Sequence, residues 1–311
     1  MDVLSDVIAT TRTGRPVSGL FERHAPWGRR YPKVEAAGFH VVLQGACVLL
    51  RDGAEPIALA VGDVVFMPRG CVHALADRPD SPLTETAHPG EPRSIPGPGV
   101  ATTLLCGSYE LAADRTHPLL AELPEVVHIP ARLGTHAALR GAVDLLAAEL
   151  AEPGLGTDAA VPPLLDLLLL YMLRARLAEA GAGGWAAAFA DPAIAAALRG
   201  IHADPRRQWT VEALGELAGL SRAAFAKRFT ATVGEPPLAY LTRWRMITAA
   251  RLLRDGDAPL ASVARQAGYG SEFAFGKAFK REYGCAPGRY RRDGGGLVVA
   301  GADTLSVPVS A

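Results

Sequence analysis

Residues 211–243 read VEALGELAGLSRAAFAKRFTATVGEPPLAYLTR, and residues 260–292 read LASVARQAGYGSEFAFGKAFKREYGCAPGRYRR. The second stretch repeats the first at an offset of 49 residues to the end of the AGL or AGY triplet. One residue is then inserted, and the offset is 50 residues from Ser221 and Ser271 onward. The identical pairs include Ser221 and Ser271, Phe225 and Phe275, Lys227 and Lys277, Phe229 and Phe279, Gly234 and Gly284, Pro237 and Pro287, and Tyr240 and Tyr290. These identities indicate an internal duplication between Thr210 and Arg292.

Each copy predicts a helix, a tight turn and a second helix. Apolar residues recur at the spacing of one helical face before the turn. Gly219 and Gly268 can adopt the positive φ angle that such a turn needs. Ser221 and Ser271 then supply N-caps for the second helices, whose phenylalanines are expected to face inward. A glycine turn before a capped second helix is typical of a helix-turn-helix, whose second helix enters the major groove of DNA.

The outward residues of these second helices are mostly cationic or small. Cations can meet phosphates, and small residues allow close approach to base edges. One basic helix face alone could simply be solvated, but two equivalent faces in tandem favour DNA binding. The candidate DNA-binding residues are Arg222, Ala223, Ala226, Lys227 and Arg228 in the first copy, and Glu272, Phe273, Gly276, Lys277, Lys280 and Arg281 in the second.

The two copies are joined by a predicted helix from Pro236 to Leu253, with prolines at its start and Gly256 beyond its end. Arg245 of this helix is a further candidate DNA-binding residue. The duplicated segment, above all GYGSEFAFGKAFKREYGCAPGRYR at residues 268–291, resembles the DNA-binding domain of AraC-type transcriptional regulators. The resemblance implies that both second helices enter adjacent major-groove segments on one face of the DNA.

At three outward positions the sequence departs from the family pattern. Ala223, Ala226 and Gly276 stand where relatives often carry longer polar side chains. Base contacts are therefore expected to be few, and DNA shape is expected to supply part of the specificity.

The composition indicates a soluble globular protein of two domains, with 311 residues of which 49% are hydrophobic. Residues 191–292 carry 17 Lys and Arg against 9 Asp and Glu, a net charge of +8, which leaves −8 for the remainder. The basic third is therefore the candidate for binding nucleic acid. No signal peptide or membrane span is evident, so a cytoplasmic location is expected.

Residues 1–130 show short apolar runs separated by glycine and proline, which predicts an all-β domain. The predicted strands include residues 39–45, 47–50, 57–59, 64–67, 72–75 and 103–107. The turn at Gly62, the Pro68-to-Gly70 turn and the strands beside them fit a small β-barrel or jelly roll. The spacing of Gly62, Pro68, Gly70 and His73 resembles the second motif of cupins. The first cupin motif is degraded, because Gly38 stands where its metal-binding glutamate is expected.

His40, His73 and Cys106 are the candidate effector or metal residues of this domain. Strand alternation is expected to point His40 into the same interior as His73. Such a set would suit a divalent metal such as zinc. The alternative is a hydrogen-bonded pair of core histidines beside an inert buried thiol. His24, His88, His117, His128, His136 and His202 have no motif around them and are expected to be ordinary.

The four cysteines, at positions 47, 71, 106 and 285, are too sparse for a disulfide scaffold and are expected to be reduced. The opening residues 1–5, the strand at 39–45 and Cys106-Gly107 resemble an AraC-type subgroup that includes reactive-chlorine-responsive regulators. This resemblance makes Cys106 a candidate redox sensor. A small organic effector held in the barrel is an equal alternative.

Between the two predicted domains the pattern becomes helical, over residues 139–150 and 164–177, with a connector at Glu152–Pro163. This pair could pack on the barrel or within a homodimer, which the family resemblance implies. Ala87–Gly99 is expected to form a loop without strands, and a further helix is expected at Pro192–Ile201.

The sequence as a whole predicts an α+β multidomain protein. Its expected domains are a cupin-like β-barrel sensor (1–130), a helical linker with a candidate dimerisation role (131–184), an all-α DNA-binding domain with two helix-turn-helix motifs (185–292) and a disordered tail (293–311). The expected function is an allosteric, non-enzymatic transcription regulator with double-stranded DNA, an effector or oxidant, and RNA polymerase as candidate partners. The alternatives are a cupin oxygenase or isomerase fused to a DNA-binding domain and, less favoured, an RNA-binding protein.

Overall fold

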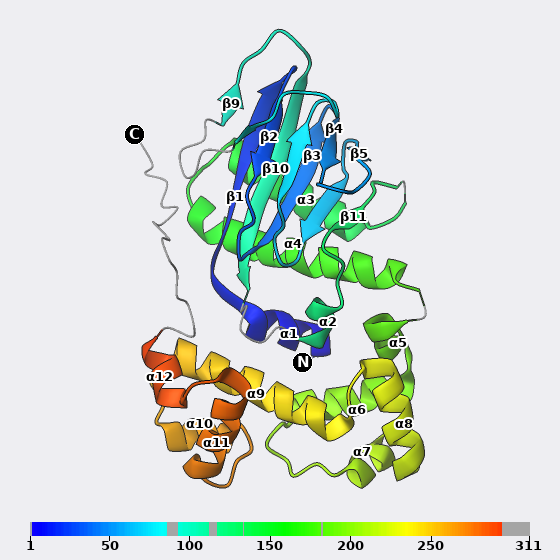
Figure 1. Ribbon diagram of the computed structural model, residues 1–311, viewed down its shortest axis with the longest axis vertical. Helices are drawn as coiled ribbons and strands as arrows, with labels where there is room; N and C mark the ends of the chain where they lie inside the picture. Colours follow the sequence, from blue (N-terminus) through cyan, green and yellow to red (C-terminus); the bar gives the residue numbers. More distant parts are fainter. Residues whose placement is uncertain (1, 86–92, 112–116, 133, 182, 294–311) are drawn as a thin grey trace. The chain divides into compact units, whose positions relative to one another are not determined.

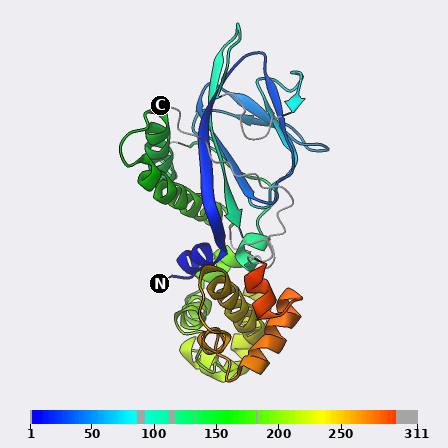
Figure 2. The ribbon, with the colours of Figure 1, turned by 90° about the vertical axis from the view of Figure 1, so that its left-hand side faces the viewer.

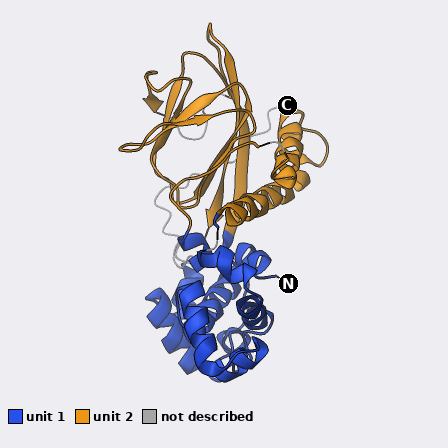
Figure 3. Ribbon diagram, turned by 90° about the vertical axis from the view of Figure 1, so that its right-hand side faces the viewer, with its two compact units in different colours: residues 1–12, 112–122, 180–303 blue, residues 13–111, 123–179, 304–311 orange. Residues whose placement is uncertain are grey.

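The computed structural model describes residues 2–85, 93–111, 117–132, 134–181 and 183–293. The chain divides into two compact units that do not follow the order of the sequence (Figure 3). Among the described residues, the helical unit comprises 2–12, 117–122 and 180–293, and the sheet unit comprises 13–111 and 123–179. Two short segments from the first half of the chain therefore fold with the C-terminal helices.

The strands of the sheet unit form two sheets (Figure 1). The first sheet has the order β11-β6-β3-β10-β1-β9, and the second has the order β5-β4-β7-β2-β8. The strand bounds are β1 Arg12–His24, β2 Gly28–Tyr31, β3 Ala37–Gln44, β4 Cys47–Leu50, β5 Ile57–Leu59, β6 Val64–Met67, β7 His73–Ala76, β8 Thr84–Glu85, β9 Ser94–Ile95, β10 Ala101–Leu111 and β11 Val127–Ile129. Among the described strands no ladder joins the two sheets, so the expected barrel is corrected to a pair of sheets, as the jelly-roll alternative has it (Figure 2).

The core of the sheet unit is built from inward residues of both sheets, as face-to-face packing requires. Val42, Val65, Met67, Leu104 and Cys106 come from the first sheet, and Cys47, Leu49, Leu59 and Leu75 from the second. Strands β3 to β7 coincide with the apolar runs that glycine turns separate, so their predicted positions are confirmed. Gly70 is essential to one such turn, since its φ is +57° and a Cβ there would collide with the Val34 carbonyl oxygen.

Two helices complete the sheet unit, α3 Ala137–Ala151 and α4 Thr157–Glu179. The Tyr109 hydroxyl of β10 donates to the Leu165 carbonyl of α4 at 2.8 Å, so α4 is fixed to the first sheet. The expected connector at Glu152–Pro163 is too long, because α4 begins at Thr157 and contains Pro162 and Pro163. The apolar face that follows, which includes the fully buried Leu165 and Leu168, offsets the hydrogen bonds that the prolines remove.

The helical unit contains the duplicated segment and the elements that pack around it (Figure 1). The first helix pair consists of α7 Val211–Leu217 and α8 Arg222–Val233, and the second pair of α10 Leu260–Gln266 and α11 Glu272–Tyr283. The long helix α9, Pro237–Asp255, connects the pairs as the sequence predicts. The other helices are α1 Val3–Thr11, α2 Pro118–Ala121, α5 Gly184–Ala190, α6 Pro192–Ala203 and α12 Pro287–Arg292.

Local patterns predict some elements wrongly. The long strand β1 is missed because RTGRPVSGLFERH alternates poorly. The segment Ala87–Gly99 contains the short strand β9, which pairs in parallel with β1, while its residues 86–92 lie outside the described residues. The expected tail is described only at Asp293, because residues 294–311 lie outside the described part.

None of the described helices combines the length and apolar character needed to cross a membrane.

Candidate functional site

The two helix pairs share the same turn and cap geometry. Gly219 and Gly268 follow the first helices with φ angles of +67° and +78°. The Ser221 hydroxyl accepts from the Ala224 amide at 3.4 Å, and the Ser271 hydroxyl accepts from the Ala274 amide at 3.1 Å. The second helices end at glycines with positive φ, Gly234 and Gly284. The caps expected from the sequence are therefore confirmed in both copies.

The inward face of each second helix is filled by two fully buried phenylalanines. Phe225 and Phe229 of α8 lie with their ring centroids 5.5 Å apart, and Phe275 and Phe279 of α11 lie 5.6 Å apart. This repeated packing fixes which face of each helix remains outside. Arg222, Ala223, Lys227 and Arg228 of α8 and Glu272, Phe273, Lys277, Lys280 and Arg281 of α11 are exposed, while Ala226 and Gly276 are half-buried.

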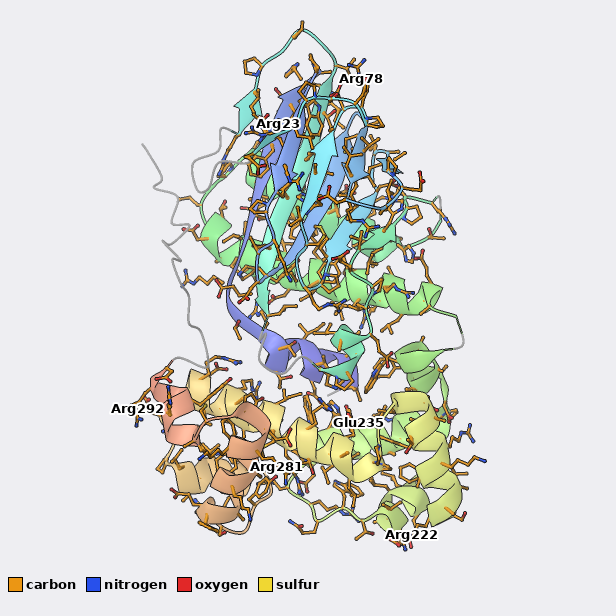
Figure 4. All side chains as sticks on the ribbon, viewed as in Figure 1. Arg23, Arg78, Arg222, Glu235, Arg281 and Arg292 are labelled. Atoms are coloured by element: carbon orange, nitrogen blue, oxygen red, sulfur yellow. The ribbon has the colours of Figure 1, made fainter. Side chains whose placement is uncertain are left out.

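The exposed cations differ in how they are engaged. Arg222 (Figure 4) contacts Glu212 at 2.8 Å. Arg228 contacts Asp191, the N-cap of α6, at 2.5 Å. Arg281 contacts the neighbouring Glu282 at 3.5 Å. Lys227, Lys277 and Lys280, in contrast, form no ion pair with the described residues. The three lysines are therefore the cations of these helices best placed to meet phosphates.

Arg245, the candidate DNA-binding residue of α9, is hydrogen-bonded within the helical unit. Its Nε donates to the Pro205 carbonyl at 2.7 Å and one Nη donates to the Arg207 carbonyl at 3.0 Å. Burial lowers the pKa of this guanidinium below its ordinary value. A Cβ on Gly268 would lie 2.9 Å from the guanidinium carbon, so glycine at the second turn leaves room for Arg245. Arg245 therefore links α9, the loop before α7 and the turn of the second pair.

His40 and His73 form the polar centre of the sheet unit. Their Nε2 atoms lie 2.8 Å apart, and the Tyr31 ring stacks on His73 with a centroid distance of 4.9 Å. Nδ1 of His73 donates to the Cys71 carbonyl at 2.9 Å, so its Nε2 must accept the proton of His40 Nε2 when both rings are neutral. Burial lowers the pKa of both histidines, most strongly for His40, which favours this neutral pair.

The donor set around this pair does not fit a zinc site. The lone pair of His73 Nε2 is occupied by His40, and the buried Nδ1 of His40 has no hydrogen-bond partner among the described residues. Within that part of the chain no group of three or more His, Cys, Asp and Glu side chains could hold a metal ion. Cys106 stands opposite His40 in the β3–β10 ladder and is buried. The observed arrangement matches the hydrogen-bonded alternative.

The thiols of the sheet unit are shielded from solvent. Burial, with a smaller contribution from Asp63, raises the pKa of Cys47 to about 12, and burial also raises the pKa of Cys71. Cys106 is 8% exposed and packs in the same core. Cys285 of the helical unit is half-buried. A reactive thiol needs access and a lowered pKa, and neither is present at Cys47 or Cys71.

A second polar cluster lies inside the helical unit, where the sequence gives no signal for it. Asp6 of α1, His117 before α2, His202 of α6 and Tyr240 of α9 are all buried and hydrogen-bonded in a row. His117 and His202, which have no motif around them in the sequence, are therefore joined in one hydrogen-bonded row. Three other histidines without a sequence motif, His24, His128 and His136, are partly exposed and contact carboxylates. His88 lies outside the described residues.

Hydrogen-bond geometry fixes the proton positions in this row. The Leu119 amide donates to Nδ1 of His117 at 3.2 Å, so neutral His117 carries its proton on Nε2 and donates to the Tyr240 hydroxyl at 3.0 Å. Tyr240 then donates to Nε2 of His202 at 2.6 Å, and Nδ1 of His202 donates to the Asp6 carboxylate at 3.2 Å. Every proton in the row has one donor and one acceptor.

Known proteins resemble this chain over both units. A family model described as cupin matches residues 2–178, and one described as a helix-turn-helix domain matches residues 214–293. A putative AraC-like transcription regulator of Streptomyces lividans is 37% identical over 94% of this chain and 98% of its own length. The HTH-type transcriptional regulator MtrA of Neisseria gonorrhoeae is 30% identical, over 86% and 91%. The RCS-specific HTH-type transcriptional activator RclR of Escherichia coli is 29% identical, over 94% and 97%.

Proposed function

The chain belongs to the AraC-like transcription regulators in which a cupin domain precedes a helix-turn-helix domain, and from this premise we propose that α8 and α11 are its two DNA-reading helices. The observation that carries the proposal is the recurrence of Lys227 and Lys277 at the same outward position of two helices with matching caps and buried faces. Each lysine is available to neutralise a phosphate. The two helices would enter neighbouring major-groove segments.

The spacing of the two helices depends on α9 and on Arg245. The guanidinium of Arg245 holds the loop carbonyls of Pro205 and Arg207 and lies against the turn at Gly268. We therefore assign Arg245 a positioning role rather than the direct DNA contact expected from the sequence. Substitution of Arg245 should weaken DNA binding because the two helix pairs would no longer be held in the same relative position. The slope of log K against log salt should not change, since no phosphate contact is lost.

The sheet unit is the proposed sensor. Strand β1 follows directly after α1, and β10 ends at Leu111, with residues 112–116 between it and His117, where the described part of the chain resumes. Both strands therefore connect covalently to segments that fold within the helical unit. A ligand that binds one state of these strands more tightly than another would alter DNA binding by that difference in free energy.

The signal itself has two candidates. A small organic effector bound by the sheet unit is the first, and oxidation at Cys106 is the second. The second is favoured by the likeness to the RCS-specific activator and by the position of Cys106 opposite His40. It requires the sheets to open, because the thiol is buried. A Cys106→Ser chain that kept the wild-type response of DNA binding to mild oxidant would exclude it.

A homodimer through α3 and α4 is proposed on the exposure of their outer apolar residues. Leu145 of α3 is 60% exposed and Leu167 of α4 is 40% exposed, on helices whose other faces are buried. We propose the domain boundaries expected from the sequence, with the sensor at 1–130, the linker at 131–184 and the DNA-binding domain at 185–292. The described segments 2–12 and 117–122 are exceptions, since they fold in the helical unit.

The test is binding of the full-length protein to duplexes selected from a randomised DNA library, followed by fluorescence anisotropy over a range of salt concentrations. Lys227→Ala and Lys277→Ala should each weaken binding and lower the slope of log K against log salt by about 1. Tyr171→Phe, in the sheet unit, is the matched control. An unchanged slope in both lysine variants would show that other surfaces bind the DNA.

A further inference from the structure

The exposed ring of Phe273 is the feature of α11 that the phosphate contacts do not explain. Its side chain is 83% exposed, and among the described large apolar residues only Leu155 is more exposed. Phe273 is the second residue of α11, directly after the end capped by Ser271. Phe275 and Phe279 already fill the inward face of the helix, so Phe273 does not contribute to the core.

The equivalent position of α8 is different. Ala223 stands there, in a helix whose cap, buried phenylalanines and outward lysine match those of α11. The duplication therefore keeps the framework but varies outward residues, and at this position it replaces a methyl group by an aromatic ring. The two helices cannot present the same surface to DNA.

The surroundings of Phe273 are open and cationic. Gly276, one helical turn further on the same face, would carry a Cβ into open space, since no heavy atom lies within 4 Å of it. Lys277 and Lys280 are exposed next along this face. The ring thus stands at the N-terminal end of a helix whose following turns attract phosphates, which is the end that contacts bases in helix-turn-helix proteins.

Only one group in the major groove offers an apolar contact to such a ring. Thymine carries a C5-methyl group there, whereas the other bases present hydrogen-bond donors and acceptors that an aromatic hydrocarbon cannot use. We infer that Phe273 contacts the C5-methyl group of a thymine and selects thymine at that position of the bound site. This inference rests on the proposed role of α11 as a DNA-reading helix.

The experiment removes the methyl group without altering base pairing. Duplexes that the full-length wild-type protein selects from a randomised library are resynthesised with each thymine replaced in turn by deoxyuridine. At one or two positions this replacement should weaken wild-type binding about fourfold for each methyl group that becomes buried. Phe273→Ala should bind the thymine duplex more weakly and should no longer distinguish thymine from deoxyuridine at those positions.

Two further variants separate this inference from the proposed function. Phe273→Leu, which keeps an apolar side chain, should retain part of the discrimination. Lys277→Ala should bind more weakly, with a lower salt slope, yet keep the full thymine preference. Because Phe273 is exposed, each Phe273 variant should melt at the wild-type temperature.

Three outcomes decide the question. If Phe273→Ala distinguishes thymine from deoxyuridine as strongly as wild type does, the inference is overturned while α11 can still read DNA. The same holds if Phe273→Ala binds DNA normally but loses transcriptional output in a reporter assay, which would assign the ring to a protein partner. If the wild-type protein selects no duplex at all, the proposed function fails instead.

Discussion

The Tyr240 hydroxyl of α9 donates to Nε2 of His202 in α6 across 2.6 Å, at the centre of a buried polar row. The row begins at His117 and ends at Asp6, so it joins four segments that are far apart in the sequence. The rings of Trp185 and Trp244 pack against it, at centroid distances of 4.9 Å from His117 and 3.9 Å from His202. The helical unit therefore has a polar centre that neither helix pair contains by itself.

Replacing Tyr240 by phenylalanine should destabilise the helical unit. The change removes one oxygen and leaves the Nε2 proton of His117 and the Nε2 lone pair of His202 buried without partners. Each unsatisfied group costs about 1–3 kcal/mol, so the free energy of unfolding should fall by at least about 2 kcal/mol. Urea denaturation followed by tryptophan fluorescence measures it. Tyr171→Phe, at a half-buried site in α4, should change it by less than about 0.5 kcal/mol.

The contrast between Tyr240 and its duplicate shows what the sequence can predict. Tyr240 and Tyr290 align in the repeat and both are buried, and the local caps, glycine turns and inward phenylalanines were all predictable from spacing. The partners of Tyr240 were not, because Asp6 and His117 come from segments with no periodic relationship to α9. Arg245 illustrates the same limit, since an outward-facing arginine and one that binds loop carbonyls look alike in sequence.

Stability should fall as the pH is lowered through the range where histidine ionises. Burial is the main cause that lowers the pKa of His117 and His202, and the Asp6 carboxylate only partly opposes it at His202. Below about pH 6.5 the unfolded chain therefore binds protons that the folded chain does not. The stabilisation is complete above that pH, and each histidine adds a slope of up to about 1.4 kcal/mol per pH unit below it.

Denaturant unfolding from about pH 7.5 to about pH 5.5 measures this slope. His117→Gln should be less stable than wild type at the upper pH. At lower pH its free energy of unfolding should depend less steeply on pH, because one histidine no longer contributes to the slope. His24→Gln, at a partly exposed site, is the control and should keep the full slope. A wild-type stability that did not change over this range would contradict the assignment of neutral buried histidines.

Cysteine labelling should separate the four thiols by burial. Cys47 has a pKa raised to about 12 and Cys71 a raised pKa, and both lie with Cys106 in the core of the sheet unit. Iodoacetamide should therefore modify half-buried Cys285 first in the folded protein, and the other three at rates limited by opening. Mass spectrometry of timed digests, with Cys285→Ala as the control, checks this order. Rapid modification of Cys106 would instead support a directly accessible sensor.

The two turn glycines provide a matched pair of substitutions. Gly219 and Gly268 both have positive φ, but a Cβ at Gly219 meets open space whereas one at Gly268 meets the Arg245 guanidinium at 2.9 Å. Gly219→Ala should cost about 1 kcal/mol for the backbone conformation alone. Gly268→Ala should cost more and, by displacing Arg245, should weaken DNA binding without changing the salt slope. Equal effects of the two changes would show that Arg245 adjusts freely.

The C-terminal helices should not reach full stability without α1. Val3, Leu4 and Val7 are buried on α1, which packs against α6 and α9. The Thr10 carbonyl also accepts from Arg254 at 3.4 Å. Each buried side chain of this size contributes about 1.5–3 kcal/mol at most, against total domain stabilities of about 5–15 kcal/mol. A fragment of residues 183–293 should therefore melt well below the helical unit of the intact chain.

A peptide of residues 2–12 tests whether α1 itself supplies this stability. Added to the fragment, it should raise the melting temperature until binding saturates, because it restores both the apolar contact and the Asp6 carboxylate beside His202. The same peptide with Val7→Asp should fail, since a charge would enter a position that is fully buried. If the fragment alone melts like the intact unit and neither peptide raises its melting temperature, α1 contributes nothing to the folding of the C-terminal helices. If only the first peptide acts, the N-terminal helix is an integral part of the helical unit.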